Sequence, residues 1–153
     1  INQKIPLKIY QHCLPDQNEF LSDFYKKNNI EFEIFNFSIN LEKYFFKVDL
    51  ALTRSGSSVL AELTNANVPF ISVPLPSSAD NHQFKNAIYY QKKNLALMIE
   101  EKELNDKLLQ LIKTIYSDKS YLDNIISNQR QFSDKNVYHN ITKQLKNIIH
   151  EKN

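Results

Sequence analysis

The sequence contains a single glycine, Gly56, where average usage of about 7% would supply roughly eleven in a chain of 153 residues. The dinucleotide fingerprint G-x-G-x-x-G, the Walker A loop and the G-x-S-x-G nucleophile elbow each need two or more glycines. The sequence therefore contains none of these motifs, and the missing elbow argues against Ser55 or Ser57 as a hydrolase nucleophile. A phosphate or nucleotide site in this chain has to combine one glycine with other groups.

Length and composition indicate one globular domain that spans residues 1–153. Hydrophobic residues make up 42% and charged residues 24% of the chain, and 19 basic against 17 acidic residues give a net charge of +2. The lysines are scattered instead of forming a basic stripe, so we expect no nucleic-acid partner. A lone cysteine, Cys13, excludes an internal disulfide and a multi-cysteine zinc site. We expect no metal, no cofactor and no transmembrane segment, because the longest apolar run, 95–99, is far shorter than the roughly 20 residues of a membrane span.

Short apolar runs alternate with helical patterns along the first hundred residues. The predicted strands are 7–10, 31–35, 49–53, 68–73 and 95–99, and the predicted helices are 17–28, 41–48, 58–65 and 81–93. This alternation predicts the α/β class, with a Rossmann-like parallel sheet and helices on both faces. Residues 103–153 show only helical patterns and form a predicted helical tail of the same domain. The tail ends in an apolar stripe that we expect to be partly exposed, made of Val137, Ile141, Leu145 and Ile148.

The loop after the predicted strand 49–53 has the residues of a phosphate site. Ligands of open parallel sheets bind beyond the carboxyl ends of the strands. Here Arg54, Ser55, Gly56 and Ser57 lie directly before a predicted helix. Glycine permits a positive φ and a close ligand approach, the start of a helix attracts anions, and arginine adds a forked contact. The alternative is that a serine only caps the helix and the glycine only makes the turn.

Glu62 favours the ligand-binding interpretation. It follows Ser58 by four residues, which places the two on one helix face about 5.4 Å apart along the axis. That rise is close to the offset between the phosphate and the ribose of a nucleotide, so Glu62 is a candidate acceptor for ribose hydroxyls. A capping box would need the acidic residue three positions after the cap instead. The alternative is a carboxylate that is favoured by the helix dipole.

The loop after the predicted strand 68–73 gathers polar groups at a second helix start. Pro74 and Pro76 stiffen this loop, and the helix opens with the sequence Asp-Asn-His-Gln at 80–83. The imidazole of His82 and the amide of Gln83 suit hydroxyl-rich ligands such as sugars, because amide and imidazole groups both donate and accept. The alternative is an ordinary capped surface helix.

The stretches 51–63, 68–74 and 80–87 resemble the MurG-like UDP-N-acetylglucosamine transferases of glycosyltransferase family 28. The likeness is to the carboxyl-terminal, donor-binding half of these two-domain GT-B enzymes, and a weaker similarity covers most of the chain from Leu7 onward. The resemblance implies a set of donor-binding residues: the loop facing the pyrophosphate at Arg54, Ser55, Gly56 and Ser57, the ribose acceptor Glu62, the sugar contacts His82 and Gln83, and the backbone around Phe37 and Ser38 at the uracil.

The same resemblance implies an activity. In this family N-acetylglucosamine passes with inversion from UDP-N-acetylglucosamine to the muramyl sugar of lipid I, without an essential metal. The amino-terminal half binds the lipid acceptor and supplies the general base, so we expect no catalytic residue in this chain. The implied location is the cytoplasm, peripheral on the inner face of the bacterial plasma membrane. Two alternatives are a non-catalytic binding subunit that depends on a membrane partner, and a related glycolipid glycosyltransferase domain.

The resemblance also implies a difference in the sheet. The donor half of this family begins with a strand and a glycine-rich loop, which the present sequence does not contain. In the family that strand lies between the strands that correspond to 7–10 and 49–53. We expect these two flanking strands to close up and pair directly. The alternative is a seam that stays open and associates with something else.

Overall fold

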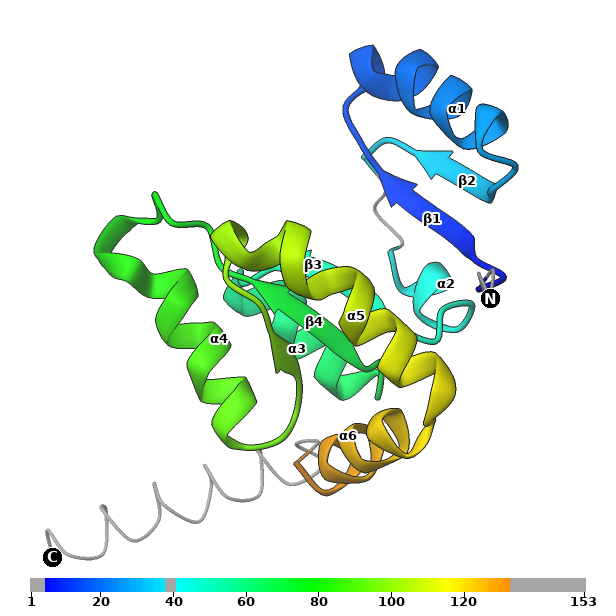
Figure 1. Ribbon diagram of the computed structural model, residues 1–153. Coiled ribbons are helices and arrows are strands. Elements are labelled where there is room, and N and C mark those ends of the chain that lie inside the picture. Colours follow the sequence, from blue (N-terminus) through cyan, green and yellow to red (C-terminus); the bar gives the residue numbers. More distant parts are fainter. Residues whose placement is uncertain (1–4, 38–40, 133–153) are drawn as a thin grey trace, which may run out of the picture.

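Two parallel sheets form the framework of the computed structural model, which describes residues 5–37 and 41–132 (Figure 1). In the first sheet, β1 (Lys8–His12) pairs with β2 (Glu31–Phe35). In the second, β4 (Phe70–Val73) lies between β3 (Ala51–Arg54) and β5 (Leu97–Met98). The parallel pairing that the alternation predicts is confirmed.

The helices lie where the sequence predicts them, with ends that differ by a few residues. The α-helices are α1 (Asn18–Lys27), α2 (Glu42–Phe45), α3 (Ser57–Asn65), α4 (His82–Lys92), α5 (Leu104–Ser117) and α6 (Ser120–Phe132). Short 3-10 turns precede three of them: η1 (Pro15–Gln17), η2 (Ala79–Asn81) and η3 (Glu101–Glu103). The largest difference is α2, a single turn where the pattern predicts 41–48. The predicted stripe of Val137, Ile141, Leu145 and Ile148 lies outside the described residues.

Helices cover both faces of the β1–β2 sheet. Tyr25 of α1 packs against Phe32, with ring centroids 5.2 Å apart. Tyr44 of α2 stacks on Phe35 at 4.0 Å. Phe32 and Phe35 are three positions apart on one strand, so they point to opposite faces. The two helices therefore sandwich this small sheet.

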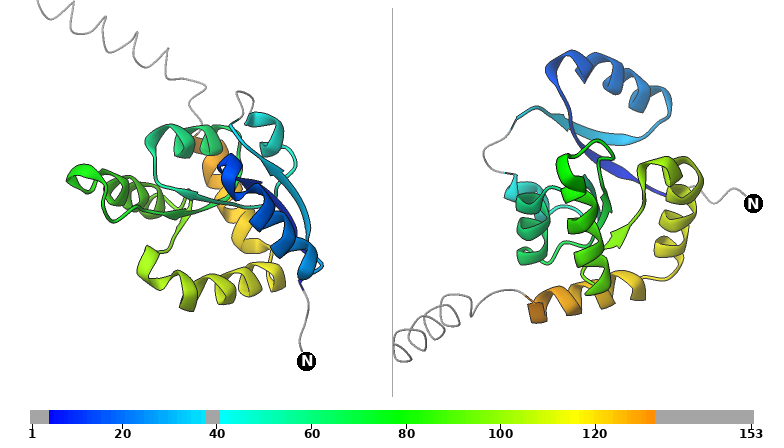
Figure 2. Two further views of the ribbon diagram at one scale, coloured as in Figure 1. Left: turned by 90° about the horizontal axis from the view of Figure 1, so that it is seen from above. Right: turned by 90° about the vertical axis from the view of Figure 1, so that its left-hand side faces the viewer.

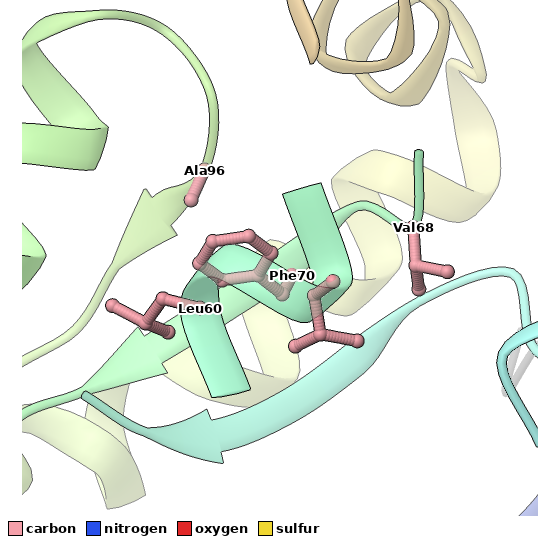
Figure 3. Close-up of a cluster of buried hydrophobic side chains, with 5 residues drawn as sticks. Leu60, Val68, Phe70 and Ala96 are labelled. Carbon is pink, nitrogen blue, oxygen red and sulfur yellow. The ribbon is translucent and has the colours of Figure 1, made fainter. Parts of the chain in front are cut away.

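The main core surrounds the second sheet. Figure 3 shows one buried cluster, in which Phe70 of β4 packs with Leu60 of α3 and with Ala96 next to β5. On the opposite face, α5 packs against Ile71 and Val73. Figure 1 and the right view of Figure 2 accordingly show α3 to α6 gathered around β3–β5, with α1, β1 and β2 at one end of the molecule.

Asparagines take the positions where many helices end on a glycine. Asn29, Asn67 and Asn94 follow α1, α3 and α4, with φ values of 54°, 57° and 55°. Helices commonly end on one left-handed residue, and asparagine is the usual substitute for glycine there. This use of asparagine explains how a chain with one glycine terminates its helices.

The predicted closure of the sheet is wrong. β1 pairs with β2 and not with β3, so the two sheets of the described chain remain separate. The prediction assumed that unpaired backbone groups would be buried, at a cost of about 1–3 kcal/mol each. Along β3, exposed Leu52 and Arg54 alternate with half-buried residues. The exposed side chains leave this strand accessible to water, which is able to satisfy free backbone groups. The seam stays open, as the alternative expects, and its association with something else stays a prediction.

Candidate functional site

Ser55, directly after β3, is held by residues of one strand, β4, and one helix, α4. Its side chain is fully buried, and its Oγ lies 2.6 Å from the Oγ of Ser72 in β4. Its N–H donates to Oε1 of Gln83 at 3.1 Å, and its carbonyl accepts from Nδ2 of Asn86 at 3.0 Å. These bonds fix the loop between β3 and α3, so the hydroxyl and the N–H of Ser55 both serve this internal support.

Gly56 does not use the positive φ that glycine permits. The residue has φ −67° and ψ 135°, an extended conformation that any residue adopts. A Cβ built there would meet only Cγ1 of Val59 at 3.8 Å, which is an ordinary contact. The fold does not require glycine at this position.

The first turn of α3 presents unpaired amides. The helix has no side-chain cap, so neither Ser57 nor Ser58 plays the capping role of the alternative interpretation. The N–H groups of Gly56, Ser57 and Ser58 have no acceptor within the described part of the chain. Both serines are exposed. Free amides at the positive end of a helix dipole attract anions, and phosphate is a common occupant.

Arg54, the last residue of β3, forms an ion pair with Glu101. Its Nη1 donates to Oε2 of Glu101, the first residue of η3 after β5. The two side chains are 49% and 42% exposed. Because β4 lies between β3 and β5, the pair links two strand ends across the middle strand. Arg54, the residue predicted to bind phosphate, therefore contacts a carboxylate of the chain itself.

The start of α4 depends on two consecutive left-handed residues. Asp80 and Asn81 have φ values of 49° and 52°. The helix then begins at His82, whose Nδ1 lies 2.7 Å from the carbonyl of Ala79. This contact occupies Nδ1 of the exposed histidine and does not involve Nε2.

Gln83 ties the two predicted site loops together. Its Oε1 accepts from the N–H of Ser55 at 3.1 Å and from the N–H of Leu75 at 3.0 Å. The side-chain oxygen is thus used within the protein. Its Nε2 has no acceptor in the described residues, so it remains a donor for a ligand.

A hollow of about 460 Å³ opens beside these loops. Its lining combines prolines and an aromatic ring with charged residues: Pro74, Leu75, Pro76, Asn81, Phe84, Glu100, Glu101 and Lys102. The ammonium of Lys102 lies 2.9 Å from the carboxylate of Glu100, and this hydrogen bond raises the pKa of Lys102 above its ordinary value. Glu101 contacts Arg54 and also borders the hollow.

The remaining predicted residues lie further out. Glu62 is exposed one turn beyond Ser58 on α3, and its carboxylate has no partner in the described residues. Phe37, in the loop after β2, is 86% exposed. Ser38 lies outside the described residues. Hydrogen bonds therefore connect the β3 and β4 loops to each other, whereas Phe37 follows a strand of the other sheet.

Sequence reasoning assigned no role to three residues that shape this site, namely Glu101, Ser72 and Asn86. Ser72 carries the one hydroxyl in the apolar strand 68–73, which is a signal for a buried hydrogen bond. Asn86 lies three residues after Gln83, on the same helix face. Glu101 follows β5 at the same sheet edge as the two predicted loops. A search of every loop at that edge would have found it.

The fold and this site define an α/β domain that presents an anion-attracting helix start at the carboxyl edge of a parallel sheet. The family model for the glycosyltransferase family 28 C-terminal domain matches residues 2–148. The chain belongs to this family. The resemblance drawn from the three sequence stretches is confirmed.

Named relatives agree with this assignment. A protein of Pelagibacter ubique is 36% identical over 147 residues, covering 95% of this chain and 41% of its own length. One of Campylobacter jejuni is 34% identical over 134 residues, covering 88% and 38%. Both are named UDP-N-acetylglucosamine–N-acetylmuramyl-(pentapeptide) pyrophosphoryl-undecaprenol N-acetylglucosamine transferase. The chain thus spans about two fifths of the length of these relatives.

A solved structure confirms the fold. The crystal structure of Acinetobacter baumannii MurG matches with a TM-score of 0.77 at 22% identity, covering 95% of this chain and 42% of that one. The predicted α/β fold with a parallel sheet and helices on both faces is confirmed.

Proposed function

We propose that this chain is the donor-binding domain of an inverting glycosyltransferase. The reaction is transfer of N-acetylglucosamine from UDP-N-acetylglucosamine to undecaprenyl-pyrophosphoryl-muramyl-pentapeptide, which converts lipid I to lipid II. The observation that carries the proposal is the family match over residues 2–148, which includes both loops at the carboxyl edge of β3 and β4. The names of the relatives supply the substrates.

The geometry supports a division of labour along the donor. The free amides of Gly56, Ser57 and Ser58 donate to the diphosphate, and Arg54 adds a positive charge. Glu62, one helical turn further along α3, accepts from the ribose hydroxyls. The proposal places no catalytic residue, metal or cofactor in this chain, because its residues bind and orient the donor.

The sugar and the base are the two ends of the donor. Nε2 of Gln83 and the ring of His82 contact the N-acetylglucosamine. Phe37 and Ser38 contribute backbone groups to the uracil. Ser55 acts by holding the loop, through its bonds to Ser72 and Gln83.

The acceptor site and the general base belong to a further domain in this proposal. It supposes a cytoplasmic enzyme that is peripheral on the inner face of the plasma membrane. Within the described residues, no helix is both long enough and apolar enough to cross a membrane.

Calorimetry with a panel of nucleotides tests the donor assignment. We expect UDP-N-acetylglucosamine and UDP to bind, UDP-glucose to bind more weakly than UDP-N-acetylglucosamine, and ADP to bind least. Equal binding of UDP and ADP would refute a uridine site. As a second test, the chain alone should transfer no sugar to a lipid I analogue, and measurable turnover would show that it carries its own acceptor site and base.

A further inference from the structure

The ion pair between Arg54 and Glu101 lies next to the amides that the proposed function assigns to the diphosphate. Arg54 directly precedes the loop that leads into α3, and Glu101 reaches it from beyond β5. The guanidinium has five N–H donors, and the contact with Glu101 uses Nη1. A phosphate that approaches the start of α3 therefore meets an arginine whose charge is already partly neutralised.

The charges around the pair of Arg54 and Glu101 further reduce the positive charge available to a phosphate. Lys102, which follows Glu101 in the sequence, is paired with Glu100. Arg54 and Lys102 are thus both matched by a carboxylate in the structure. The two glutamates also line the hollow beside the site. A diphosphate carries several negative charges, so the Glu101 carboxylate repels it. The same carboxylate also occupies Arg54, which would otherwise bind the diphosphate.

Because Arg54 and Glu101 are both partly exposed, little free energy is lost when Arg54 exchanges Glu101 for a phosphate. Both side chains are close to half exposed, and ion pairs in such positions contribute little net stability. The β3 loop does not depend on this pair, since Gln83 and Asn86 hold it independently. Releasing Glu101 would leave the loop in place.

We propose that Glu101 is an internal competitor of the donor diphosphate for Arg54. This inference rests on the proposed function. With an empty site, Glu101 holds the guanidinium. When the diphosphate binds, Arg54 turns to the phosphate oxygens and Glu101 is released. The competition lowers the affinity for the diphosphate and so eases the release of the nucleotide product.

The test compares Glu101→Gln with the parent 153-residue chain. Glutamine keeps the size and an oxygen acceptor for Arg54 but removes the negative charge. Inorganic pyrophosphate, UDP and uridine are titrated at low and high salt. We expect Glu101→Gln to bind pyrophosphate and UDP about two- to fivefold more tightly at low salt, to show a smaller gain at high salt, and to leave uridine binding unchanged.

Two further variants isolate the competition. Glu103→Gln removes a nearby carboxylate that pairs with Lys107 instead of Arg54, and it should change pyrophosphate binding much less. In an Arg54→Ala background, the gain from Glu101→Gln should shrink, because the two residues no longer share a partner. Backbone amide spectra confirm that each variant is folded.

The outcomes separate this inference from the proposed function. Unchanged or weaker pyrophosphate binding by Glu101→Gln overturns the competition, and weaker binding would identify Glu101 as a support for Arg54. Tighter pyrophosphate binding without any preference for UDP over ADP upholds the competition and refutes the uridine site. No binding of pyrophosphate by any variant overturns both.

Discussion

The two sheets of this chain differ in how completely they are buried. All four residues of β4 are buried, and helices pack on both faces of the β3–β5 sheet. In β1 and β2, every residue is half-buried or exposed. The first sheet nevertheless has helices on both faces, so helix cover alone does not bury a strand. A strand needs neighbours on both sides, and β4 is the one described strand that has them.

This difference coincides with the location of the proposed site. The β3 and β4 loops extend from the well-packed sheet, and hydrogen bonds through Gln83 and Asn86 hold them. The less buried region carries several exposed apolar side chains: Leu7, Leu14, Phe20, Phe24, Phe37 and Phe46. The better-packed sheet thus positions the amides that we propose for the diphosphate. Exposed apolar side chains occur in both regions, since Leu52 and Leu109 belong to the second.

The largest effect should come from the core of the β3–β5 sheet. Phe70→Ala removes a fully buried ring and should lower the free energy of unfolding by about 3–5 kcal/mol. Phe20→Ala, on α1, removes a ring that is 72% exposed and should change it by less than about 0.5 kcal/mol. Urea unfolding measures both. Similar losses would show that the two regions contribute equally to stability.

The next effect concerns ligand binding by α3. Glu62→Ala should weaken UDP binding by about ten- to a hundredfold, because a hydrogen bond to a charged group is worth roughly 1.5–3 kcal/mol. Glu19→Ala is the matched control, since Glu19 is also an exposed carboxylate near a helix start but belongs to α1. Calorimetry reads both. Equal UDP affinity of Glu62→Ala and the parent would show that Glu62 does not bind the ribose.

A smaller loss of stability should follow from the buried amide of α6. Nε2 of Gln129 donates to the carbonyls of Val68 at 3.1 Å and Leu95 at 2.8 Å, near the starts of β4 and β5. Gln129→Ala leaves these carbonyls without that donor and should cost about 1–3 kcal/mol. Asn128→Ala removes one exposed bond to Asn94 and should cost less. Thermal unfolding of the two variants compares them, and the reverse order would contradict the buried role.

Much of this architecture could be predicted from local patterns, and the failures have a common cause. The strand at 31–35 is exact, and α3 differs from its predicted range by one residue. The closure of the seam was predicted wrongly, and the role of Glu101 was missed. Each depends on which distant segments of the chain meet. β1 does not reach β3, and Glu101 contacts Arg54 from 47 residues away. Hydrophobic periodicity indicates which face of a helix or strand is buried, but not which distant residues that element contacts.

The smallest expected effect is on self-association. The open edge of β3 and the exposed side chain of Leu52, 54% accessible, favour pairing with another strand. The parent chain should therefore form larger species as its concentration rises. Leu52→Lys should reduce this, because charged side chains protect edge strands. Leu109→Lys, at a 60% exposed position on α5, should reduce it less. Sedimentation velocity measures the distribution, and a monomer at all concentrations would contradict the expectation.

The central claim is that the better-packed sheet carries the nucleotide-sugar site. A titration with UDP-N-acetylglucosamine that is followed at each backbone amide tests it most directly. We expect the largest shifts at Gly56, Ser57 and Ser58, further shifts near Glu62 and Gln83, and small ones in β1. Shifts confined to the β1–β2 sheet, or equal shifts produced by ADP, would contradict it.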